Sequence, residues 1–111
     1  MFTASNAGLF PDRNFVTYSA TKAATIAMAK LMAVDHAGDN VRVNALSPGA
    51  VATRRMLHRY GSMEKARRTA GPKHLLNRLG EPDEIAHAVG FIFENDLFTG
   101  RCVEVDAGLR I

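Results

Sequence analysis

Tyr18-Ser19-Ala20-Thr21-Lys22 contains the pair of side chains best suited to chemistry in this sequence. Tyr18 and Lys22 are four positions apart, so on a helix they share one face. A phenol with a pKa near ~10 is a poor acid–base catalyst at neutral pH, but a neighbouring ammonium group favours the phenolate and lowers that pKa. The pair is a physically sensible proton-transfer device, although a plain surface Tyr–Lys pair has the same spacing.

A serine lies 13 residues before Tyr18, at the end of a short strand expected within residues 1–5. In an open parallel sheet, ligands bind beyond the carboxyl ends of the strands. The hydroxyl of this residue, Ser5, is therefore placed to hydrogen-bond a substrate oxygen, or else to cap a helix or loop.

A third segment with possible site residues follows Asn44 and runs from Ser47 through Pro48-Gly49 to Thr53. It is expected to leave its strand at the same sheet edge as Ser5. Pro48 and Gly49 fix a turn, and Gly49 permits close approach of the backbone to a flat ligand. Taken alone, Pro48-Gly49 is only a turn.

The elements that must position these residues alternate between strand and helix. Residues 16–36 lack Gly and Pro and are rich in helix formers, and Gly38 is a plausible stop. Pro82, Asp83 and Glu84 suit the first turn of a later helix. The expected order is a strand tail at 1–5, a loop at 6–15, a helix at 16–36, a strand at 41–47, one or two short helices with a mobile loop around Gly71-Pro72 at 54–79, a helix from Pro82 and a strand at 102–105. This alternation predicts an α/β fold with a parallel sheet.

The helix expected at 16–36 is apolar on more than one side. A helix on the surface of a monomer needs only one apolar stripe, so the second indicates a partner subunit. One stripe comprises Ala23, Ile26, Ala27, Lys30, Leu31 and Val34, and the other comprises Ala24, Met28 and Met32.

Composition excludes several classes of protein. The 111 residues carry a net charge of +3, with 47% hydrophobic and 23% charged residues, as in one ordinary globular domain. No apolar run is long enough to span a membrane, and the first residues do not resemble a secretory signal. With a single cysteine, Cys102, the expected location is the cytoplasm. The basic segment at 54–68 lacks a nucleic-acid-binding pattern, and the four histidines lack metal-site spacing, so neither partner is expected.

Taken together and in this order, the motifs resemble the C-terminal half of the short-chain dehydrogenase/reductase family. The matching residues are Ser5, Tyr18-x-x-x-Lys22, Asn44…Pro48-Gly49-x-x-x-Thr53, Leu76 to Ala86, and Thr99-Gly100…Val105-Asp106-Ala107-Gly108. The resemblance implies a partial Rossmann-like, doubly wound parallel sheet spanning residues 1–111. It also implies an oxidoreductase that transfers a hydride between NAD or NADP and an alcohol or carbonyl substrate.

The resemblance also assigns roles to residues. Tyr18 would be the general acid/base, Lys22 would lower its pKa and bind the nicotinamide ribose, and Ser5 would orient the substrate carbonyl. Pro48, Gly49, Val51 and Thr53 would contact the nicotinamide end of the cofactor. Residues 54–79 correspond to the family's substrate loop, and Ala107-Gly108 stands where the family has Gly-Gly. Family members are commonly dimers or tetramers, which implies a homo-oligomer.

The family's Gly-rich phosphate loop has no counterpart in this sequence, nor does its catalytic asparagine on the helix before Ser5. The first half of a family subunit carries that loop. We therefore expect a fragment that binds cofactor poorly and is inactive alone. The alternative is a non-catalytic remnant that associates with homologous subunits through the helix at 16–36.

Overall fold

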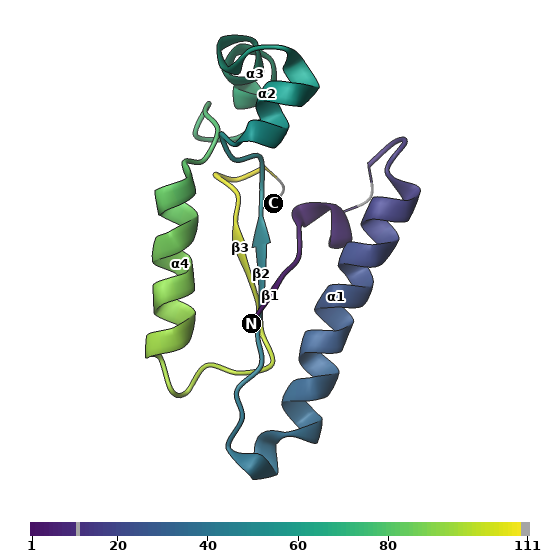
Figure 1. The fold of residues 1–111 in the computed structure, drawn as a ribbon, viewed down its shortest axis with the longest axis vertical. Coiled ribbons are helices and arrows are strands. Elements are labelled where there is room, and N and C mark those ends of the chain that lie inside the picture. Colours follow the sequence, from purple (N-terminus) through teal and green to yellow (C-terminus); the bar gives the residue numbers. More distant parts are fainter. Residues whose placement is uncertain (11, 110–111) are drawn as a thin grey trace.

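The fold was analysed in a computed structural model, which describes residues 1–10 and 12–109. Strands and α-helices alternate along the chain, and short 3-10 helices join some of them (Figure 1). The elements are β1 (Phe2–Thr3), η1 (Asn6–Gly8), α1 (Val16–Asp35), η2 (Ala37–Asp39), β2 (Ala45–Pro48), α2 (Arg54–Tyr60), α3 (Met63–Ala70), η3 (Gly71–Lys73), α4 (Pro82–Glu94) and β3 (Cys102–Val105).

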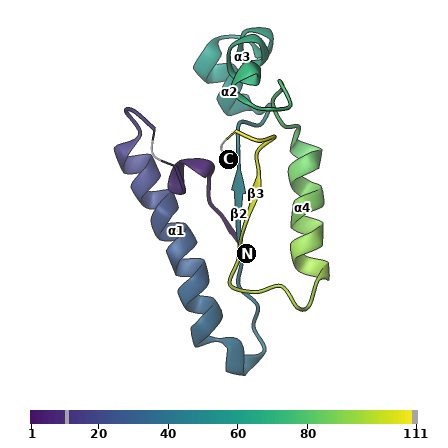
Figure 2. The ribbon, with the colours of Figure 1, turned by 180° about the vertical axis from the view of Figure 1, so that it is seen from behind.

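The three strands form one parallel sheet in the order β1-β2-β3. Phe2 pairs with Ala45, and Ala45 pairs with Cys102 on its other side. Helices α1 and α4 flank the sheet on opposite sides, and the α2–α3 pair lies beyond the carboxyl end of β2 (Figures 1 and 2). This arrangement confirms the expected α/β fold with a parallel sheet.

The main core lies between α1 and the sheet. Ile26, Ala29 and Ala33 of α1 are buried against Val43 and Ala45, and Met32 packs at their edge. The stripes expected for this helix were therefore partly wrong. Leu31 and Val34 are 64% and 76% exposed, because the inward face runs through Ile26, Ala29 and Ala33 instead. The second stripe was wrong as well, because Met32 packs on the core. The apolar residues that α1 exposes to solvent come from both expected stripes and include Met28, Leu31 and Val34.

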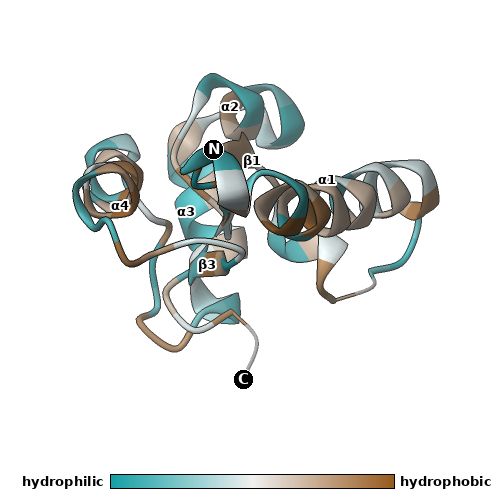
Figure 3. Ribbon diagram, turned by 90° about the horizontal axis from the view of Figure 1, so that it is seen from below, coloured by the Kyte–Doolittle hydropathy of each residue, from teal (hydrophilic) through white to brown (hydrophobic). Residues whose placement is uncertain are grey.

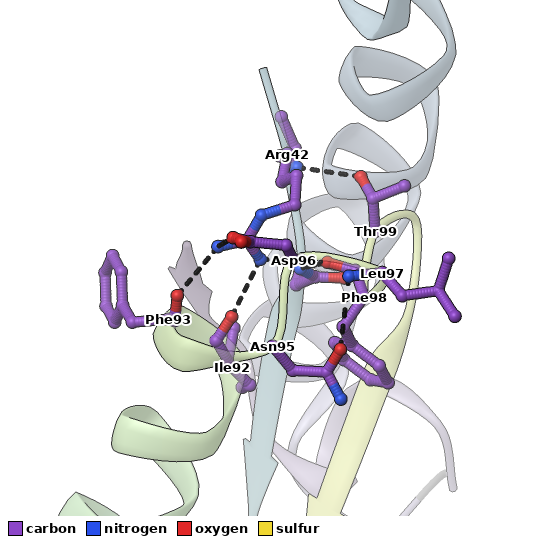
Figure 4. A network of polar contacts seen from close by, with 10 residues as sticks. Arg42, Ile92, Phe93, Asn95, Asp96, Leu97, Phe98 and Thr99 are labelled. Carbon is purple, nitrogen blue, oxygen red and sulfur yellow. Dashed lines mark hydrogen bonds and ion pairs between the residues drawn. The ribbon is translucent and has the colours of Figure 1, made fainter. Parts of the chain in front are cut away.

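The strand expected at 41–47 is shorter than predicted and begins at Ala45. The preceding residues are held by side chains instead. The guanidinium of Arg42 donates hydrogen bonds to the carbonyls of Ile92 and Phe93 at the end of α4, at 2.9 and 2.8 Å (Figure 4). It also donates to Phe98 at 3.1 Å. Arg42 thereby ties α4 to the chain entering β2, and its charge suits the negative end of a helix.

The segment at 54–79 was expected to contain one or two short helices, and it contains two α-helices, α2 and α3. They meet at Gly61, not at Gly71-Pro72, and Gly61 has φ +83°, which favours glycine. The mobile loop expected at Gly71-Pro72 is a 3-10 helix, and Gly71 is buried. Met56, Ala66, Ala70 and Leu79 form a second, separate core beneath this helical pair.

Helix α4 covers the other face of the sheet, opposite α1 (Figure 3). As predicted, Pro82 is in its first turn, and Glu81 and Glu84 form a reciprocal capping box. Arg78 pairs with Glu84 at 2.6 Å and so fixes the chain entering the helix. In the part of the chain that the structure describes, no helix is long and apolar enough to cross a membrane.

Candidate active site

Ser5 reaches Tyr18 because η1 lies directly against α1. Gly8 permits this contact, since a Cβ there would lie 2.6 Å from the backbone carbon of Lys22 and 2.8 Å from the nitrogen of Ala23. Ser5 caps η1, and its Oγ accepts a hydrogen bond from the amide of Ala7 at 3.3 Å. The capping role and the approach to Tyr18 are therefore compatible.

The Tyr18 phenol is half-buried near positive charge. Burial raises its pKa, but a hydrogen bond with Ser5 and the positive charges of Arg55 and Lys22 outweigh that effect. The pKa of Tyr18 therefore lies below the ordinary value of a phenol. The Arg55 guanidinium also lies over the Tyr18 ring, 4.6 Å from its centroid. Such an environment favours a phenol that gives up its proton more readily.

Lys22 lies on the same face of α1 as Tyr18, as its spacing predicts. Its Nζ is 5.7 Å from the centroid of the Tyr18 ring and donates a hydrogen bond to the carbonyl of Thr3 at 2.9 Å. The ammonium group is thus anchored to the end of β1. It acts on Tyr18 through its charge, and it does not line the cavity beside the phenol.

The Pro-Gly segment emerges beside Ser5, at the carboxyl end of β2. Gly49 is needed for a close approach, but the neighbour it approaches is the chain itself: a Cβ would lie 2.7 Å from the Cβ of Asp106. Beyond it, Val51 forms a parallel bridge with Gly80. The Thr53 side chain makes no capping hydrogen bond to α2, so the helix does not occupy its hydroxyl.

One cavity of about 450 Å³ gathers most of the predicted residues. This volume lies within the range of ~300–1,000 Å³ that is usual for small-molecule sites. Asn44 lies elsewhere, buried between the carbonyl of Phe98 and the amide of Arg101. The predicted residues that line the cavity are Ser5, Tyr18, Pro48, Gly49, Val51 and Thr53.

A buried polar network supports the floor of the site. The Asn6 side chain donates to the carboxylate of Asp106 and accepts a hydrogen bond from the Ser47 hydroxyl at 3.0 Å. Asp106 also accepts from the amide of Gly108 at 2.9 Å. These contacts tie η1, β2 and the chain after β3 together. We infer that Asp106 holds Ser5 in place through Asn6.

Sequence reasoning missed the cations of the helical segment as site residues. Arg55 and Arg59 are one turn apart on α2, and both reach the start of α1. Arg59 lies over the Phe15 ring, 5.0 Å from its centroid, as Arg55 lies over Tyr18. The four-residue spacing of the arginines was the available signal. Among residues 1–10 and 12–109, no group of three or more His, Cys, Asp or Glu could hold a metal ion.

The fold agrees with the results of comparison with known proteins. The family model described as Enoyl-(Acyl carrier protein) reductase matches residues 1–110. The chain belongs to the short-chain dehydrogenase/reductase family.

Named relatives within the family are dehydrogenases and reductases. The chain is 37% identical over 110 residues to 3-oxoacyl-(acyl-carrier-protein) reductase FabG of Thermotoga maritima, covering 97% of this chain and 44% of that protein. It is 33% identical to 7alpha-hydroxysteroid dehydrogenase of Bacteroides fragilis, covering 97% of this chain and 42% of that enzyme. The chain thus spans less than half the length of these relatives.

Solved structures show the same likeness. A short-chain dehydrogenase family protein from Francisella tularensis superposes with a TM-score of 0.88 at 28% identity, over 97% of this chain and 49% of that one. A 4-hydroxyisoleucine dehydrogenase complexed with NADH gives 0.86 at 28% identity, over 96% and 44% of the two chains. These likenesses confirm the Rossmann-like fold.

Proposed function

We propose that residues 1–111 form the catalytic part of an NAD(P)(H)-dependent oxidoreductase that acts on an alcohol or carbonyl group. The observation that carries the proposal is the meeting of the Ser5 and Tyr18 hydroxyls in one cavity with the segment from Pro48 to Thr53. Two hydroxyls of different acidity beside a free cavity suit the binding and protonation of a carbonyl oxygen.

Each side chain then has a defined task. Ser5 donates a hydrogen bond to the substrate oxygen and orients it. Tyr18 gives its proton to that oxygen during reduction and takes the hydroxyl proton during oxidation. The charges of Arg55 and Lys22 stabilise the phenolate that remains. Because Lys22 is held by the Thr3 carbonyl, its charge stays close to the Tyr18 ring.

The residues present fit the nicotinamide end of the cofactor. Pro48, Gly49 and Val51 offer a narrow backbone wall beside Tyr18, and the hydroxyl of Thr53 offers a hydrogen bond. When bound there, the nicotinamide would supply or accept the hydride. The sequence has no Gly-rich loop for the diphosphate, so we expect this chain alone to bind NADH and NADPH weakly and to be inactive.

Two measurements test this proposal. Titration of the chain with NADH and NADPH, followed by nicotinamide fluorescence, should show no saturation in the micromolar range. The chain is then joined behind the N-terminal half of the Thermotoga maritima reductase, which supplies a dinucleotide-binding part, and assayed for carbonyl reduction. Tyr18→Phe should lower kcat about 10³-fold, in the range typical of a lost general acid.

The control for this assay is Thr17→Val, which removes an exposed hydroxyl from the same helix at a position that does not line the cavity. It should leave turnover unchanged. Near-normal turnover of Tyr18→Phe would remove that residue from its role. Saturable micromolar binding of NADH by the chain alone would contradict the expected weakness of cofactor binding.

A second candidate is association without turnover, and the outer face of α1 favours it. Leu31 and Val34 are exposed there together with Met28. The occupant that fits best is a second copy of this chain, because two equivalent apolar faces cover each other in a symmetric dimer. Sedimentation should show a dimer that Leu31→Glu dissociates, whereas Val16→Glu, also exposed but at the start of α1, should not dissociate it. A monomeric wild-type chain would contradict this proposal.

A further inference from the structure

The cavity beside Tyr18 carries an excess of positive charge. Arg55, Arg59 and Lys73 line it, whereas Asp12 is the one carboxylate among the lining residues that the structure describes. An apolar or neutral substrate would gain nothing from this excess. The charges are therefore informative about the compound that the cavity accepts.

Within the part of the chain that the structure describes, these cations have no acidic partner. The ion pairs found within residues 1–10 and 12–109 join other residues, among them Arg67 with Glu81 and Arg78 with Glu84. The guanidinium carbon of Arg59 instead lies over two aromatic rings, 5.0 Å from the centroid of Phe15 and 5.6 Å from that of Tyr60. A guanidinium stacked in this way keeps N–H groups at its edge for an anion.

The two arginines divide the cavity into two ends. Arg55 lies over Tyr18, where the reacting oxygen would bind, and contributes to the low pKa of that phenol. Arg59 lies one turn further along α2, about 6 Å along the helix axis. A single small molecule can place its carbonyl at Tyr18 and a second group at Arg59. Met56, which is buried in the second core, fixes the helix in this orientation.

We propose that the substrate carries an anionic group, such as a carboxylate, sulfonate or phosphate, which binds Arg59 and Lys73 while its carbonyl or hydroxyl carbon lies at Tyr18. This inference rests on the proposed function only for the end of the substrate that reacts at Tyr18. The same chemistry could come from the diphosphate of the dinucleotide, so the experiment must separate the two sources.

The test uses the 111-residue chain and a matched pair of ketones, 4-acetylbenzoate and 4-acetylbenzamide. They share the ketone and the ring and differ in charge. Binding is measured at low ionic strength by NMR titration of backbone amides. Acetylbenzoate should bind at least tenfold more tightly than acetylbenzamide. Arg59→Gln and Lys73→Gln should each lose most of that preference, and added salt should weaken it.

Arg101→Gln is the matched control, because it removes the same charge from an exposed residue outside the cavity. It should keep the preference. Equal binding of the two ketones, no binding of acetylbenzoate, or an equal loss in Arg101→Gln would overturn the inference. Thermal unfolding of Arg59→Gln checks that the variant is folded. Lys73→Gln tests the charge preference independently of Arg59→Gln.

Inorganic pyrophosphate separates the two sources of negative charge. If the cations serve the cofactor, pyrophosphate should bind more tightly than acetylbenzoate, compete with it and depend on Arg59 more strongly. That result would overturn the assignment to substrate. Binding of the ketones requires no turnover, so the charge preference should persist in Tyr18→Phe. Failure of the acid–base proposal therefore remains distinguishable from failure of this one.

Discussion

Asn6 donates a hydrogen bond from its side-chain amide to the carboxylate of Asp106, which lies 100 residues further along the chain. Asn6 is buried and directly follows Ser5, so this bond fixes the start of η1 against the end of β3. The geometry of the candidate site thus depends on a contact between the two ends of the described chain. Removal of this contact gives the first prediction.

Asp106→Ala should lower the free energy of unfolding by about 2 kcal/mol, because it leaves the buried Asn6 amide without its acceptor while keeping the Cβ that packs on Gly49. Urea denaturation measures this change. Asp96→Ala is the control, since its carboxylate is 99% exposed and pairs with Arg42 at 3.7 Å. It should lower the free energy of unfolding by less than about 1 kcal/mol. Equal effects of the two changes would remove the Asn6–Asp106 contact from the account.

Gly8→Ala should destabilise the chain by about 2 kcal/mol, because the new methyl group meets the backbone of α1 at Lys22 and Ala23. Gly38→Ala is the matched control, since a Cβ there has no neighbour within 4 Å. Its effect should be within about 0.5 kcal/mol of zero. The two midpoints of thermal unfolding provide the comparison. A Gly8→Ala variant as stable as Gly38→Ala would mean that η1 is not held against the helix.

Ala107→Gly should stabilise the chain by about 1 kcal/mol. Ala107 has φ 55°, in the left-handed region, which is unfavourable for a residue with a Cβ. By the family resemblance this is the position where a first glycine is expected. Chemical denaturation measures the free energy of unfolding. Ala86→Gly, within α4, is the control in which the same substitution should lower that free energy by about 1 kcal/mol. A destabilised Ala107→Gly would show that the backbone there is not strained.

The ion pair of Arg78 with Glu84 predicts a pH dependence. The hydrogen bond from Arg78 is the main cause that lowers the pKa of Glu84 to about 2, and the amide of Glu81 adds to it. A carboxyl whose pKa is lowered by folding contributes stability above its ordinary pKa and loses it as the pH falls towards 2. In Glu84→Gln, the free energy of unfolding should therefore fall less steeply than in the wild type between about pH 4.5 and 2. The same pH dependence in both proteins would contradict this assignment.

Periodicity and motif spacing predicted much of the architecture and several site residues. Helix α1 and strand β3 follow from runs of matching residues, and Ser5 and Pro48-Gly49 line one cavity because the parallel strands β1 and β2 end at one edge. The start of β2 could not be predicted, because Arg42 binds carbonyls from distant residues.

The cations of the cavity were not predicted as site residues for a similar reason. The direction in which Arg59 points depends on how Met56 packs against Ala66 and Leu79, and local sequence does not encode that tertiary contact. Lys22 illustrates the same limit. Its spacing from Tyr18 was informative, but its anchor, the Thr3 carbonyl, belongs to another element.

If Tyr18 is an activated phenol, a titration of phenol absorbance with pH will show its lowered pKa. The chain has two tyrosines, Tyr18 and Tyr60, so two ionisations are observed. One should have a pKa below the ordinary value near ~10. It should vanish in Tyr18→Phe, persist in Tyr60→Phe, and shift upward in Ser5→Ala and Arg55→Gln. Two phenols with pKa values at or above the ordinary value, or an early ionisation that survives in Tyr18→Phe, would contradict the activation of Tyr18.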